Sequence, residues 1–164
     1  PMTLIPPHHA MRRIADLYHS EMKANGRQVG RGERLGVLRQ IYFGRDSNDI
    51  RKLANAGNAG ITFGRFWGHF GFCEAFRLPA DEERWPRGQT MLPESEWTID
   101  RMIESNYIFA GSAAGVRKEM DALVEAASPE YFAWMFDQGL LPMEVLKRQL
   151  REFGERIMPH YQRT

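Results

Sequence analysis

Hydrophobic and polar positions along the chain predict buried strands that alternate with amphipathic helices. Residues 35–43 form the clearest strand, because β-branched and aromatic side chains dominate their second half and charges are few. Residues 2–5 and 131–136 are shorter apolar runs that we also interpret as strands. A further short apolar run covers residues 107–110 and ends at a Gly-Ser pair.

Helical periodicity fills the segments between these runs. Apolar side chains recur at helical spacing over residues 10–25 and 144–157. Ser112 can cap a further helix at its N-terminus, and a short helix is expected over residues 94–105. Because strands alternate with helices, the order of elements indicates βαβ units and a parallel sheet.

One predicted helix is rich in glycine. It follows the N-cap candidate Asp46 and is expected to run as far as Phe76. Its glycines would form a stripe about 80° wide beside an aromatic face. The glycines are Gly57, Gly60, Gly64, Gly68 and Gly71, and the aromatic residues are Phe63, Phe66, Trp67 and Phe70. Each interior glycine costs about 1 kcal/mol relative to alanine, so the stripe predicts close packing against a neighbouring element, with backbone contact to a flat ligand as the alternative.

Composition places the chain among globular domains and excludes several classes of protein. Its 164 residues include 22 Lys and Arg against 21 Asp and Glu, a formal net charge of +1 that gives no general attraction to nucleic acid or anionic membranes. No apolar stretch reaches the ~18 residues of a membrane span, and no signal peptide is recognisable, so we expect a cytoplasmic protein. The single cysteine, Cys73, excludes an internal disulfide and predicts a small buried side chain.

The candidate site residues follow the ends of predicted strands. His8 and His9 come just after the strand at residues 2–5, and Arg45 follows the strand at residues 35–43. Because ligands of α/β folds bind outside the carboxyl ends of strands, these three side chains are predicted to line a substrate pocket. The alternatives are histidines in a solvated loop and a surface ion pair of Arg45. Neither a metal site nor any catalytic residue is predicted.

Three segments resemble a known family. Residues 109–116, Phe-Ala-Gly-Ser-Ala-Ala-Gly-Val, resemble the Gly-Thr/Ser-Pro-x-x-Val segment of bacterial luciferase-like flavin monooxygenases, with Ala113 in place of the usual proline. Residues 153–160, Phe-Gly-Glu-Arg-Ile-Met-Pro-His, resemble the closing segment of that family. Residues 39–45, Arg-Gln-Ile-Tyr-Phe-Gly-Arg, resemble its penultimate strand.

The resemblance implies an α/β fold, the C-terminal portion of a (β/α)8 TIM-type barrel with parallel strands and flanking helices. A complete barrel takes about 250 residues, so the barrel would be incomplete in this chain. We expect residues 1–164 to form a single segment made of the last two to three β/α units. The Pro-rich, charged residues 77–94 predict an irregular insertion. The family's phosphate-binding segment would lie before Pro1.

The family's activity is insertion of one oxygen atom into an organic substrate through reduced flavin mononucleotide (FMN). The resemblance therefore implies FMN as cofactor, a small organic substrate and molecular oxygen as partners, and a flavin reductase as a further partner. We expect the isolated chain to be inactive and to form a homo-oligomer that covers its unpaired strand edges. The alternatives are a non-catalytic oligomerising α/β protein and a deazaflavin-dependent oxidoreductase of the same superfamily.

Overall fold

The computed structural model describes residues 2–4, 6–57, 59, 67–135 and 139–161. These residues form four strands, β1 (Met2–Leu4), β2 (Gly36–Phe43), β3 (Ile108–Gly111) and β4 (Tyr131–Trp134). The helices are α1 (His8–Ala24), α2 (Ser47–Ala56), α4 (Asp81–Arg84), α5 (Ile99–Glu104), α6 (Ala113–Ala127) and α7 (Met143–Arg156). Short 3-10 turns cover Gly68–Phe70, Phe72–Phe76, Glu94–Glu96 and Met158–His160.

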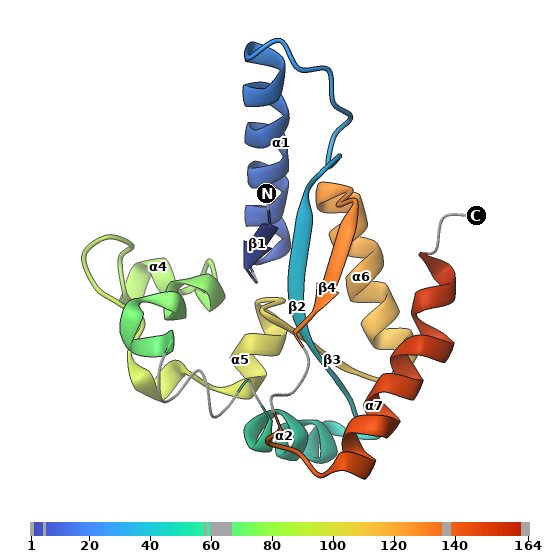
Figure 1. Ribbon diagram of the computed structural model, residues 1–164. Coiled ribbons are helices and arrows are strands. Elements are labelled where there is room, and N and C mark those ends of the chain that lie inside the picture. The colour runs from blue at the N-terminus through green and yellow to red at the C-terminus, as the bar shows by residue number, and fades with distance from the viewer. Residues whose placement is uncertain (1, 5, 58, 60–66, 136–138, 162–164) are drawn as a thin grey trace.

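The sheet is parallel, as the alternation of elements predicted, and β2 is its centre (Figure 1). The first half of β2 pairs with both β1 and β4, and its second half pairs with β3. The Met135 amide donates to the Arg39 carbonyl at 2.7 Å, and the Gly44 amide donates to the Gly111 carbonyl at 3.1 Å. Successive residues of a strand direct their backbone groups to opposite edges. Thus β4 occupies one edge of β2, whereas β1 and β3 follow each other along the other edge.

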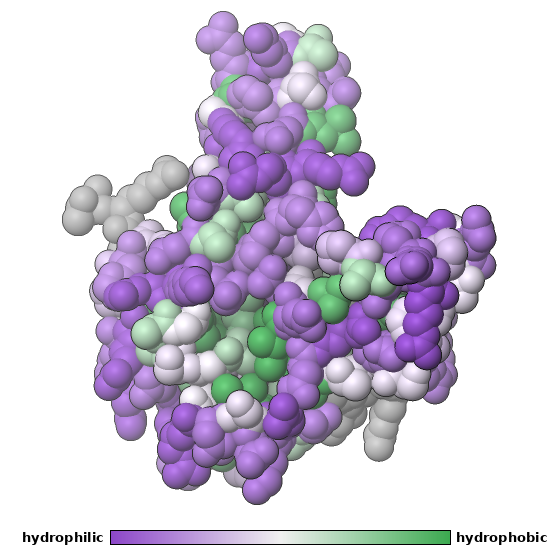
Figure 2. Space-filling view, turned by 180° about the vertical axis from the view of Figure 1, so that it is seen from behind, coloured by the Kyte–Doolittle hydropathy of each residue, from purple (hydrophilic) through white to green (hydrophobic). Residues whose placement is uncertain are grey.

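The two faces of the sheet are covered by different parts of the chain. Val37, Ile41 and Phe43 pack in one apolar cluster with Met11 of α1 and Val116 of α6. The outer surface of this helical side is mostly hydrophilic, with apolar atoms gathered near its centre (Figure 2). The opposite face of β2 packs through Tyr42 against the segment that connects α2 with β3. In this second cluster Cys73 is fully buried, as predicted, and burial raises the pKa of its thiol.

The prediction of one glycine-rich helix from Asp46 to Phe76 is wrong. The Asp46 side chain does cap α2, but the helix ends at Ala56, and Gly57 is extended. Gly71 has a φ of +82°, which separates two 3-10 turns. The helical stripe is therefore lost. Four of its residues lie outside the described part of the chain, Gly60, Gly64, Phe63 and Phe66.

Close packing is nevertheless confirmed at two of these glycines. A Cβ atom at Gly57 would lie 2.9 Å from Cε1 of Tyr42, and one at Gly68 would lie 2.4 Å from Cζ3 of Trp97. Real Cβ atoms do not approach other atoms so closely, so both positions require a residue without a side chain. The two glycines serve separate contacts in the tertiary structure rather than one face of a helix.

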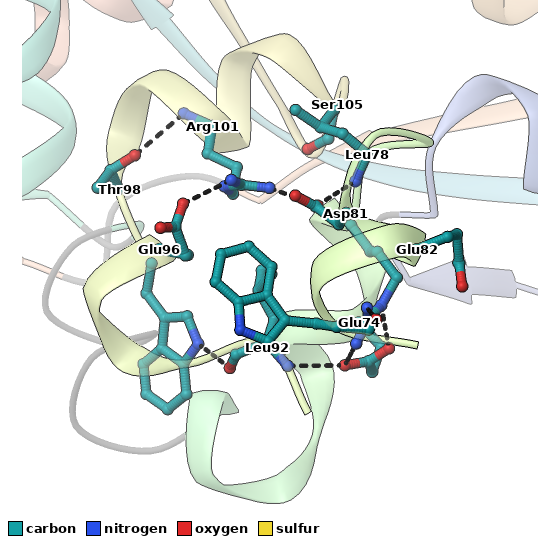
Figure 3. A network of polar contacts seen from close by, with 12 residues as sticks. Glu74, Leu78, Asp81, Glu82, Leu92, Glu96, Thr98, Arg101 and Ser105 are labelled. Carbon is teal, nitrogen blue, oxygen red and sulfur yellow. Dashed lines mark hydrogen bonds and ion pairs between the residues drawn. The ribbon is translucent and has the colours of Figure 1, made fainter. Parts of the chain in front are cut away.

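Two arginines organise the insertion that was predicted over residues 77–94. The buried Arg77 donates to both carboxylate oxygens of Glu74 at 2.7 Å and to the backbone carbonyls of Trp85 and Thr90. Arg101 joins Asp81 and Glu96, and each contact is 2.5 Å long (Figure 3). Apart from the single turn of α4 and the start of one 3-10 turn, residues 77–94 form no regular structure. Charge-assisted hydrogen bonds therefore replace backbone ladders in ordering this segment.

Among the described residues, no helix combines the length and the apolar composition that crossing a bilayer requires.

Candidate functional site

A cavity of about 420 Å³ lies where the carboxyl ends of β2 and β3 meet α2, α6 and α7. We call it the arginine cavity. Its lining residues are Phe43, Gly44, Arg45, Asp49, Gly111, Ser112, Ala113, Arg148, Glu152 and Arg156. In α/β folds the carboxyl ends of parallel strands are where ligands bind, so this position makes the cavity the candidate functional site.

Gln149 fixes the wall of the cavity at the end of β2. Its side-chain oxygen accepts from the Phe43 amide at 2.7 Å, and its side-chain nitrogen donates to the Phe43 carbonyl at 2.8 Å. The described part of β4 pairs as far as Trp134, opposite Arg39, so no described strand residue pairs with the Phe43 backbone on that edge. The buried amide of Gln149 supplies both missing hydrogen bonds.

Two glycines and a serine shape the turns at the cavity. A Cβ atom at Gly44 would lie 2.5 Å from Cγ1 of Ile50, so the absent side chain lets α2 start close to the end of β2. Gly111 has a φ of +147°, and the space beside its Cα is open. Ser112 caps α6 by accepting from the Gly115 amide at 3.2 Å. The β3–α6 turn thus leaves room at the cavity wall.

Three arginines and two carboxylates set the electrostatics of the cavity. Nε of Arg45 donates to Oδ2 of Asp49 at 3.2 Å, and Nε of Arg156 lies 3.4 Å from Oε2 of Glu152. The Arg45 backbone amide also donates to Asp49, and this hydrogen bond, ahead of the guanidinium, lowers the pKa of the Asp49 carboxyl. The side chain of Arg148 makes no hydrogen bond or ion pair within the described part of the chain. The lining therefore carries one positive charge in excess.

The structure brings Arg45 to the arginine cavity and places the two histidines elsewhere. His8 lies at the start of α1 with Nε2 3.1 Å from Oε2 of Glu119, and its ring centroid is 5.7 Å from that of Phe109. Burial lowers the pKa of His8. His9 is exposed. Their predicted contact with a substrate stays a prediction.

Sequence reasoning missed the residues of α7 and the buried Arg39. Arg148, Gln149, Glu152 and Arg156 lie on a helix whose apolar face alone was read from the sequence. Arg39 is fully buried, donates to the carbonyls of Leu38 and Pro6, and places its guanidinium 5.4 Å from the centre of the Phe109 ring. Burial lowers its pKa to about 9. The signal that could have singled it out was its position as the one charged residue of a strand that is mostly apolar.

No group of three or more His, Cys, Asp or Glu side chains in the described residues could hold a metal ion. The lining of the arginine cavity offers a ligand guanidinium groups, a hydroxyl and two carboxylates. The guanidinium groups and the hydroxyl recognise anionic and polar ligand atoms.

The sequence matches no protein-family model and no curated protein sequence. Solved structures resemble the fold, and two of them are monooxygenases. Monooxygenase RslO1 from Streptomyces bottropensis is 19% identical, with a TM-score of 0.66 over 98% of this chain and 41% of that chain. The oxygenating constituent of 3,6-diketocamphane monooxygenase from Pseudomonas putida, a type II Baeyer-Villiger monooxygenase in complex with FMN, is 15% identical, with a TM-score of 0.73 over 100% of this chain and 43% of that chain.

The fold is thus similar to part of the structures of these two monooxygenases, with a parallel sheet and flanking helices. The chain spans less than half the length of either solved structure. The predicted fold class, a C-terminal portion of a (β/α)8 barrel, is confirmed, and so is the predicted resemblance at the level of the fold. Strands β1 and β4 pair with the first half of β2, and β3 pairs with its second half.

Proposed function

We propose that the chain forms part of an FMN-dependent monooxygenase that inserts one atom of molecular oxygen into a small organic substrate. The observation that carries this proposal is the similarity of the whole chain to part of an FMN-bound Baeyer-Villiger monooxygenase. The position of the arginine cavity at the carboxyl ends of β2 and β3 supports it. FMN in that structure favours a flavin over a deazaflavin.

In this function the reduced flavin supplies the oxygen chemistry, and the protein supplies binding, orientation and protection from water. The residues of this chain that would hold polar ligand atoms are Arg45, Arg148 and Ser112, at the cavity. Gln149 holds the end of β2 in place beside them. The segment that connects α2 with β3 packs against one face of β2 through Tyr42 and thereby keeps water from that face.

The isolated chain is expected to lack turnover, because it spans 43% of the FMN-bound structure. The partners in this proposal are the organic substrate, molecular oxygen and a flavin reductase that delivers reduced FMN. A cytoplasmic location and a homo-oligomeric state belong to the same proposal.

The test is flavin retention by a longer polypeptide that contains this chain and completes the barrel. We expect FMN to remain with that protein through gel filtration and its reduced form to consume oxygen. The isolated chain, passed over the same column, is the control and should lose FMN. A completed barrel that retains neither FMN nor a deazaflavin would contradict the proposal in favour of a non-catalytic protein. Retention of a deazaflavin alone would contradict it in favour of the related oxidoreductase.

A further inference from the structure

We propose that the arginine cavity binds an oxyanion of the phosphate class through Arg45, Arg148 and Arg156. The cavity is the site of the proposed function, but this inference concerns only the anion and does not require flavin chemistry. Three guanidinium groups come from the β2–α2 connection and from α7, whereas only two carboxylates line the same space. Positive charge in excess at a concave site attracts anions.

The hydrogen-bonding capacity of the three arginines is only partly used. Arg45 and Arg156 each engage their carboxylate through Nε. Among the described residues, no hydrogen bond uses the terminal nitrogens of these two guanidinium groups or any side-chain nitrogen of Arg148. Because the guanidinium fork donates two parallel hydrogen bonds to a carboxylate or a phosphate, the unused nitrogens suit such a ligand.

The backbone that carries Arg148 is held firmly relative to β2. Gln149, the next residue, is buried and bonds both backbone groups of Phe43. Arg148, Glu152 and Arg156 follow at intervals of four residues and so share one face of α7. Arg45 enters the same space two residues after Phe43. Packing of α7 against β2 therefore fixes the backbone positions that carry the arginines, although the arginine side chains themselves are exposed.

The opposite wall of the cavity leaves space for the anion. Gly111 has no neighbouring atom within 4 Å of where its Cβ would lie, and Ala113 has a small side chain. The first turn of α6 contains no acidic residue, so the positive end of its dipole adds to the field of the arginines. A tetrahedral oxyanion fits this combination of open space and donors.

The first experiment titrates the full chain with inorganic phosphate at constant ionic strength and follows binding by phosphorus NMR and calorimetry. We expect saturable binding with a dissociation constant of about 1–10 mM, typical of a partly exposed site. Arg148→Gln should weaken binding by at least about threefold. Arg151→Gln, on the same helix but outside the cavity lining, is the matched control and should leave binding unchanged.

A second pair of variants tests whether removal of a negative charge from the cavity strengthens phosphate binding. Glu152→Gln removes a cavity carboxylate and frees Arg156, so it should tighten phosphate binding. Glu155→Gln, its matched control, removes an exposed carboxylate outside the lining and should have no effect. Absence of saturable binding would overturn the inference. Equal effects of each variant and its control would also overturn it, because phosphate binding would then follow the overall charge of the protein.

Competition experiments with two flavins, FMN and riboflavin, distinguish the possible sources of the phosphate. If the phosphate belongs to FMN, FMN should compete with inorganic phosphate and riboflavin, which lacks the phosphate, should not. Competition by both flavins alike would contradict recognition of the phosphate. Saturable phosphate binding without competition by FMN would support the anion site and would assign it to free phosphate or a phosphorylated substrate. The proposal of FMN-dependent function would then still be decided by the separate flavin-retention experiment.

Discussion

The side-chain amide of Gln149 takes the place of a neighbouring strand beside Phe43. It accepts from the Phe43 amide at 2.7 Å and donates to the Phe43 carbonyl at 2.8 Å, although 106 residues separate the two positions. The pairing occurs four residues beyond Arg39, the last residue of β2 that pairs with the described part of β4. A helix side chain thus completes a strand at the edge of the candidate site.

Removal of that amide should destabilise the protein. Gln149→Leu keeps the buried volume but leaves two backbone groups of Phe43 without partners, at a cost of about 1–3 kcal/mol. Urea unfolding measures the free energy of unfolding. Gln28→Leu, at an exposed position, should change it by less than about 0.5 kcal/mol. Equal unfolding midpoints for the two variants would contradict the role of Gln149.

Two glycines should respond to the same substitution with opposite signs. Gly68→Ala places a Cβ atom against Trp97 and should cost about 1–3 kcal/mol through overpacking. Gly154→Ala, in α7, meets nothing within 4 Å and should stabilise the protein by about 0.5–1 kcal/mol, because alanine is the better helix former. Melting temperatures of both variants measure the difference. A higher melting temperature for Gly68→Ala would show that the Gly68–Trp97 contact is not tight.

The Glu74–Arg77 pair should make the insertion sensitive to acid. The hydrogen bond from Arg77 lowers the pKa of the Glu74 carboxyl below its usual value. A carboxyl whose pKa is lowered on folding stabilises the protein above its unfolded pKa, about 4.3 for glutamate, and this stabilisation is lost as the pH falls through the folded value. Glu74→Gln should therefore lower stability near neutral pH and flatten its decline in acid. The exposed Glu21→Gln is the control, and urea unfolding across this pH range is the measurement. Parallel pH profiles for wild type and Glu74→Gln would contradict the prediction.

FMN binding by the isolated chain should be weak. The chain spans less than half of the FMN-bound structure, so most contacts to the flavin would have to come from elsewhere in a barrel. We expect a dissociation constant weaker than about 100 μM in a titration that follows flavin fluorescence. Submicromolar binding would mean that this chain alone holds a complete flavin site.

The isolated chain should associate through its strand edges. In the described residues β1 and β4 each pair only with β2, and Met2 and Tyr131 on these strands are 60% and 58% exposed. Unpaired edges favour pairing with a second chain, most simply in a two-fold dimer. Sedimentation equilibrium should give about twice the chain mass of 19.0 kDa, and Tyr131→Glu should shift it toward the monomer. Leu17→Glu, at an exposed position of α1, is the control. A stable monomer of the unmodified chain would contradict the prediction.

The sequence by itself determined the order and type of most elements. The runs at residues 35–43 and 131–136 became β2 and β4, and the helical patterns at residues 10–25 and 144–157 became α1 and α7, each within two residues at either end. These elements are local, because the period of apolar side chains reports which face of a helix or strand is buried. The position of Arg45 at the cavity follows from the strand that precedes it, and its exposed ion pair with Asp49 is the alternative considered for it, so its contact with a substrate stays a prediction.

Only the tertiary structure decided where the glycine-rich region stops being helical and how the cavity is built. Gly57 and Gly68 are small because Tyr42 and Trp97 approach them, and neither contact is visible in a helical spacing. In the sequence Gln149 is only a polar position of an amphipathic helix, whereas in the structure it binds backbone groups of Phe43 that no described residue of β4 pairs with. Arg148 and Arg156 meet Arg45 only after α7 has packed across the end of β2. The local period of apolar residues predicts which face of an element is buried. These contacts depend instead on which distant segment packs against that face, and only the tertiary structure determines it.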